Sequence, residues 1–232
     1  AFPRIVSGQP IVFDMDGKTL TVGGQILNSL GSIGSNVGNT NSGGGTRIYT
    51  MSGTLELNGT AAQTTLGGTD LPGTFNNLII NNAAGVTLTG SSIINGALTL
   101  TAGTLATGAN TLTLNGSTSG SGFINTGASG TLTYGGTVAQ TLAASNLTSG
   151  AVNNLNISNA AGVTSNNAIT VSGTTTIAAG STLSMGAALT ANGAVTVNGT
   201  FQLNSGGWAT GSGVWNYSSN GTLAFNTTYG VD

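Results

Sequence analysis

The chain has 232 residues, of which 38% are hydrophobic and only 3% are charged, against roughly 25% charged in a typical soluble domain. It contains no histidine and no cysteine, which removes the commonest general base, thiolate nucleophiles and disulfides. The net charge is -2 and the basic residues Arg4, Lys18 and Arg47 all precede residue 48. A phosphate-binding stripe cannot be assembled from them, so nucleic acid is a poor partner.

We expect no membrane span, because no apolar run approaches the ~18 residues that one requires. Ionisable groups are too few to move protons or to hold metals, and the sequence therefore predicts a protein that is not an enzyme. Catalytic residues, metal ligands and cofactors are all predicted to be absent.

Residues 1–17 are predicted to form an N-terminal strand or cap. Within them Asp14 and Asp16 resemble the opening of a calcium loop, but its twelfth position is Gln25 instead of an acidic residue. The two aspartates also suggest a glycosidase carboxylate pair, by analogy with polysaccharide-cleaving β-helices. The other carboxylates lie almost wholly outside the repeated part of the chain, so a plain turn is the better interpretation.

A long repeat follows. Residues 76–87 return as residues 153–164 with ten of twelve positions identical, and residues 59–64 return as residues 136–141. Both pairs have an offset of 77, which is typical of stacked structural units. We assign copies to residues 53–129 and 130–206 and a partial third copy to residues 207–232, where residues 212–225 correspond to residues 121–134.

A shorter period lies inside each copy, where closely and evenly spaced glycines separate short alternating strings. Such alternation is typical of strands with one dry face. The residues predicted to point inward are Leu98, Leu100, Leu112, Leu114, Val195, Val197, Phe201 and Leu203. Three such strands give a coil of about 19 residues, and four coils account for one copy. The predicted fold is an all-β, single-domain parallel β-solenoid over residues 18–232. An antiparallel meander is the alternative suggested by the Asn-Gly pairs.

Residues 17–24, 130–141 and 152–164 resemble repeats in large secreted β-helical surface proteins and adhesins of Gram-negative bacteria, particularly of Bacteroidetes-like lineages. This resemblance implies an extracellular or cell-surface location and a structural or adhesive role. It supplies no functional residues to carry over.

Thr-x-Thr strings suggest a further possibility, because a ladder of them on one face can bind ice. The strings that begin at Thr87, Thr99 and Thr111 follow one another at steps well short of a coil, which moves each to another face. Only Thr111 and Thr131 are about one coil apart. Threonine as an ordinary strand former is therefore the preferred interpretation.

Aromatic residues gather near the C-terminus, where they predict a wider terminal core, a docking surface or a sugar-stacking site. An open solenoid end also templates further strand pairing. We therefore expect an extracellular filament that assembles head to tail, with a surface polysaccharide as an alternative partner. The alternative function is the stalk of an adhesin, with ice or polysaccharide binding ranked lower. The predicted self-assembly interface comprises Phe2, Ile5, Val6, Ile11, Phe13, Trp208, Trp215, Tyr217, Phe225 and Tyr229.

Overall fold

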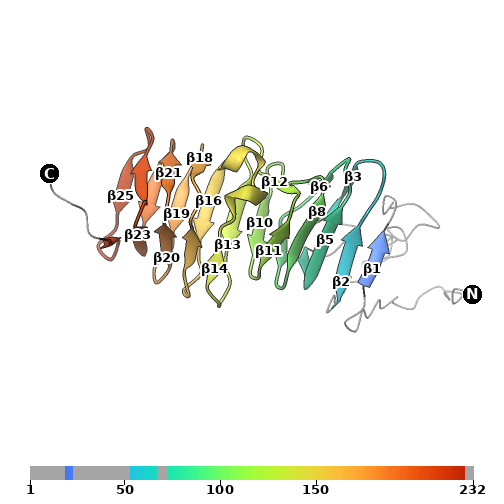
Figure 1. Cartoon of the computed structure of the whole chain (residues 1–232), viewed down its shortest axis with the longest axis horizontal. Helices are drawn as coiled ribbons and strands as arrows, with labels where there is room; N and C mark the ends of the chain where they lie inside the picture. Colours follow the sequence, from blue (N-terminus) through green and yellow to red (C-terminus); the bar gives the residue numbers. More distant parts are fainter. Residues whose placement is uncertain (1–18, 23–52, 67–72, 228–232) are drawn as a thin grey trace, which may run out of the picture.

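The computed structural model describes residues 19–22, 53–66 and 73–227, and within them the chain forms a parallel β-solenoid. Short strands stack coil upon coil from β1 at one end of the rod to β25 at the other (Figure 1). The pairings between coils are parallel, as in β10 with β13 and β13 with β16. The predicted fold class is confirmed, and the antiparallel meander is wrong.

The strands of the described residues form five sheets, named A to E, whose members are given in stacking order. Sheet A contains β1 (Thr19–Val22), β2 (Thr54–Leu57), β5 (Asn77–Asn81), β8 (Leu98–Ala102) and β11 (Thr118–Gly120). Sheet B contains β3 (Gln63–Leu66), β6 (Val86–Leu88), β9 (Thr104–Ala106) and β12 (Phe123–Asn125).

Sheet C is the longest of the five. It contains β4 (Thr74–Phe75), β7 (Ser92–Ile94), β10 (Thr111–Leu114), β13 (Thr131–Tyr134), β16 (Asn154–Ile157), β19 (Thr175–Ile177), β22 (Val195–Val197) and β25 (Trp215–Tyr217).

Sheets D and E belong to the second half of the rod. Sheet D contains β14 (Gln140–Thr141), β17 (Val163–Ser165), β20 (Thr182–Met185), β23 (Thr200–Asn204) and β26 (Thr222–Asn226). Sheet E contains β15 (Ala151–Val152), β18 (Ile169–Val171), β21 (Ala188–Ala191) and β24 (Trp208–Thr210). Two short 3-10 helices, η2 (Ala144–Asn146) and η3 (Thr148–Gly150), lie between β14 and β15.

One regular coil is slightly longer than the predicted 19. Thr111 pairs with Thr131 and Thr175 pairs with Val195, and each of these steps is 20. The step from Thr131 to Asn154 is 23, because the longer connection with η2 and η3 lies between them. Three strands per coil, as predicted, give the rod three faces.

The core fills the interior of the coils. All eight residues predicted to point inward are buried, with exposed fractions from 0% at Leu98 to 8% at Leu203. Burial of a side chain of this size contributes about 2 kcal/mol. Because each inward residue lies directly above another from the previous coil, the interior consists of ladders such as Leu112, Leu132 and Leu155.

The long repeat does not contain a whole number of coils, so the prediction of four coils per copy is wrong. The second copy, residues 130–206, holds eleven strands from β13 to β23, and each has a counterpart at the same place in the first copy, from β2 to β12. Eleven is not divisible by three. Consequently β2 and β5 lie in sheet A, whereas their counterparts β13 and β16 lie in sheet C. The second copy is turned by one face relative to the first.

The segments that are repeated between the two copies form a buried cluster of hydrogen bonds around Gln140, which we call the polar clamp. The Gln140 side chain accepts a hydrogen bond from Gly136 N at 3.1 Å and from Asn159 Nδ2 at 2.7 Å. Its Nε2 donates to Leu114 O at 2.9 Å and to Gly116 O at 2.8 Å, on the preceding coil. The amide therefore satisfies backbone groups at a corner where sheet pairing is interrupted.

The first copy repeats part of this arrangement. Gln63 Oε1 accepts from Gly59 N at 3.2 Å and from Asn82 Nδ2 at 2.9 Å. Both asparagines also donate to a main-chain oxygen, Asn82 to Ala61 O and Asn159 to Val138 O. The clamp gives a physical reason for the identity of the two strings, since the carboxamide of glutamine or asparagine offers two N–H donors and a carbonyl acceptor in one side chain.

One buried hydroxyl without a partner leads to a stability prediction. Thr175 is 1% exposed between Leu155 and Val195 on an inward ladder, and among the described residues its Oγ1 has no hydrogen-bond partner. Thr175→Val replaces this hydroxyl with a methyl group of similar volume. We expect the free energy of unfolding to rise by about 1 kcal/mol, because a buried unsatisfied group is removed.

Urea denaturation monitored by circular dichroism measures this change. The control is Thr190→Val, at a partly exposed position of sheet E, for which we expect a change within about 0.5 kcal/mol. A loss of stability in Thr175→Val would show that the hydroxyl is satisfied in solution.

Candidate docking end

Within residues 73–227, no coil is stacked beyond the last strands at one end of the rod. In stacking order β25, β26 and β24 are the last strands of sheets C, D and E. Their inward residues continue the core ladders: Trp215 follows Val195, Tyr217 follows Val197, and Leu223 follows Phe201. In the part of the chain that the structure describes, a core residue in such a position has a neighbouring coil on one side only. It therefore remains partly exposed despite its inward orientation.

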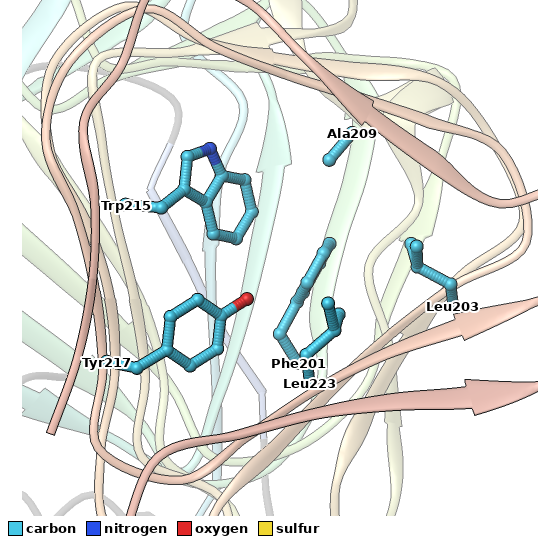
Figure 2. Close-up of a pocket in the computed structure, with 6 residues that line it drawn as sticks. All are labelled: Phe201, Leu203, Ala209, Trp215, Tyr217 and Leu223. Carbon is cyan, nitrogen blue, oxygen red and sulfur yellow. The ribbon is translucent and has the colours of Figure 1, made fainter. Parts of the chain in front are cut away.

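These residues line an open apolar hollow of about 230 Å³. Figure 2 shows this hollow, with the labelled side chains pointing into the space enclosed by the coil. The lining residues are Phe201, Leu203, Ala209, Trp215, Tyr217 and Leu223.

Aromatic contacts organise the hollow. The Trp215 ring packs against Phe201 in a tilted arrangement with centroids 4.8 Å apart, and it stacks with Tyr217 at 6.3 Å. Figure 2 shows that the Tyr217 hydroxyl points toward the middle of the hollow. Partial burial raises the pKa of Tyr217 above its ordinary value, because the charged phenolate loses solvation. A tyrosine hydroxyl is neutral at physiological pH even at its ordinary pKa of about 10, so none of the residues that line the hollow carries a charge.

The structure separates the predicted interface residues into groups. Trp215 and Tyr217 meet in the hollow, and Phe225 continues the ladder of Leu203 with 59% of its surface exposed. Trp208 is 58% exposed, but it lies beside the inward Ala209 on β24. Because successive side chains of a strand alternate, Trp208 faces the outer side of sheet E. The remaining predicted residues, Phe2, Ile5, Val6, Ile11, Phe13 and Tyr229, lie outside the described residues.

Sequence reasoning missed Ala209 and Leu223 as part of this end. A signal for Leu223 existed, because residues 212–225 correspond to residues 121–134 and Leu223 falls on Leu132. Leu132 is 0% exposed in the middle of the rod, whereas Leu223 is 43% exposed. The same position is thus a core residue inside the array and a surface residue at its end.

Among the described residues, no group of three or more histidine, cysteine, aspartate or glutamate residues could hold a metal ion. In the same part of the chain, no helix has the length and apolarity to cross a membrane. Comparison with protein-family models, with curated proteins and with solved structures found no match to the chain.

Proposed function

We propose that this chain is a non-enzymatic, extracellular structural protein whose copies join end to end into a filament. The open end of the last coil carries the proposal. It combines exposed core residues, among them Leu223 at 43% exposure, with three terminal strands from three different sheets. Terminal strands present backbone donors and acceptors that pair with a further strand, and exposed apolar side chains gain free energy when covered.

The occupant we propose for this end is a coil of a second copy of the chain. The internal counterpart of the last coil supports this choice. At residues 121–134, Leu132 and Tyr134 are covered by Leu155 and Ile157 of the next coil and are at most 2% exposed. A coil of the same array therefore covers these positions inside the rod. The uncharged hollow also favours a neutral partner, since burying an unpaired charge is costly.

A contact between one end and the opposite end of the next copy is heterologous, so it propagates instead of closing. The first described strand of the other end is β1, in sheet A. An extracellular location fits a chain that depends on threonine, serine and asparagine for its polar surface. It also agrees with the resemblance to secreted repeat proteins.

Negative-stain electron microscopy and sedimentation velocity of the purified chain test the proposal. We expect fibres one rod wide for the wild type. Leu223→Lys places a charge beneath the incoming coil and is expected to give single rods, because the ammonium group would be buried without a partner. Since Leu223 is partly exposed, the single rod tolerates the substitution.

The matched control is Thr190→Lys, on the outer side of sheet E and not among the residues that line the hollow. It adds the same charge and should leave the fibres intact. Single rods of the wild type at all concentrations would refute the filament and favour the stalk of an adhesin.

A further inference from the structure

The outer side of sheet C carries two adjacent columns of threonine and asparagine. In the first column Thr111 pairs with Thr131, which pairs with Asn154. The second column is longer and runs through Thr113, Thr133, Asn156, Thr176, Thr196 and Asn216. The sequence alone did not reveal these columns, because the longer step between β13 and β16 interrupts the regular spacing.

The two columns form a regular array. Neighbouring strands are about 4.8 Å apart, and residues i and i+2 of one strand are about 6.7 Å apart. Thr111 and Thr113 thus repeat as Thr131 and Thr133 one strand further along. Thr176 pairs with Asn156, and Thr174, two residues before it, bonds to Asn154. The first column ends at Thr174, because Ala194 stands two residues before Thr196 on the next strand. Both intervals are comparable with those at which oxygen atoms repeat on the faces of hexagonal ice.

The side chains of the array are held in place. Threonine is branched at Cβ, which restricts its first side-chain torsion. Asn154 joins three coils: its Oδ1 accepts from Thr174 N at 2.9 Å and from Thr174 Oγ1 at 3.0 Å, and its Nδ2 donates to Thr131 Oγ1 at 3.5 Å. A surface ordered in advance loses little entropy when it binds an ordered partner.

The chemistry of the array selects a neutral, hydrogen-bonding partner. The sequence has no charged residue between Asp70 and Asp232, so this part of the rod offers no attraction for ions or for charged polymers. From Thr111 to Thr196 the two columns present hydroxyl, methyl and amide groups and no aromatic ring on which a sugar could stack. Most members are accessible: Thr174 is exposed and Thr111, Thr113, Thr131, Thr176 and Thr196 are partly exposed, whereas Thr133 is only 7% exposed.

We propose that the outer surface of sheet C binds ice. Its threonine methyl and hydroxyl groups hold a layer of water in the repeat of the array, and this layer merges with the crystal. The surface lies on the outer side of the rod and not in the hollow, so single rods and filaments present it alike. Sheet E makes a useful contrast, because its column Thr170, Thr190 and Thr210 has no threonine beside it. The residues two positions earlier on these strands are Ala168, Ala188 and Trp208.

Thermal hysteresis and ice-crystal shaping of the purified full chain test this proposal. The wild type is expected to lower the freezing point below the melting point and to facet growing crystals. Thr176→Lys, in the middle of the array, is expected to abolish both effects, because the long ammonium side chain prevents contact over several strands. Thr190→Lys adds the same group to sheet E and is expected to keep them.

Thermal unfolding followed by circular dichroism checks that both variants are folded. Thr113→Lys provides a second site on the same face and should behave like Thr176→Lys. Absence of hysteresis and of shaping in the wild type would overturn the proposal. Equal loss in the sheet C and sheet E variants would also overturn it, because it would mean that the array has no special role. Neither result bears on fibre formation, which depends on the end of the rod.

Discussion

Replacement of Gln140 by leucine is expected to lower the free energy of unfolding by about 4 kcal/mol, at about 1 kcal/mol for each of four hydrogen bonds. The buried Gln140 amide binds Gly136 N, Asn159 Nδ2, Leu114 O and Gly116 O. Leucine fills a similar volume but leaves these groups without their partner. Because the bonds reach the previous coil, the loss weakens the stacking of coils as well as the corner itself.

Urea denaturation of Gln140→Leu measures this effect against a matched control, Gln202→Leu. Gln202 lies on the outer side of β23, where its Nε2 donates to Asn204 Oδ1 on the same strand at 2.8 Å. The same chemical change there is expected to cost less than about 1 kcal/mol. Equal effects of the two substitutions would contradict a structural role for the clamp.

The second large effect is expected for Gly193→Ala. A Cβ atom at Gly193 would overlap the carbonyl oxygen of Gly173, the glycine of the preceding coil at the same corner. The atom in the way belongs to the main chain and cannot rotate aside, so the two coils must separate locally. We expect a loss of about 3 kcal/mol in the free energy of unfolding, which is the upper range for overpacking.

Gly180→Ala separates this steric effect from backbone strain. Gly180 has a φ of +75°, but no atom lies within 4 Å of the position that its Cβ would take. Only the left-handed conformation opposes alanine there, at a cost of about 1 kcal/mol. Thermal unfolding of both variants compares the two contributions. If Gly180→Ala proved the more damaging, close stacking of the corners would not be the main reason for the glycines.

The alternation of apolar and polar residues was sufficient to predict the strands and their buried faces. Leu98, Leu112 and Val195 could be assigned to the core because a strand exposes every second side chain to one face, whatever its neighbours are. Parallel stacking followed from the long repeat, which a meander does not require.

The register between coils could not be predicted, because it depends on corner lengths that the sequence does not mark. The connection from β14 to β15, with η2 and η3, lengthens its coil and shifts every later strand. The docking end and the threonine columns both depend on this register. Leu223 becomes a neighbour of Phe201, and Thr176 a neighbour of Asn156, only when the connection lengths are known.

The second copy of the 77-residue repeat is turned by one of the three faces of the rod relative to the copy before it. This rotation has a consequence for longer arrays of the same repeat. Any feature fixed to one position of the repeat would point in a new direction with each copy added, and would return to its first direction with every third. Such an array would therefore display each feature on all three faces of the rod, and the pattern would repeat after every three copies. A bundle of these rods could then make equivalent sideways contacts on all sides without any change of sequence.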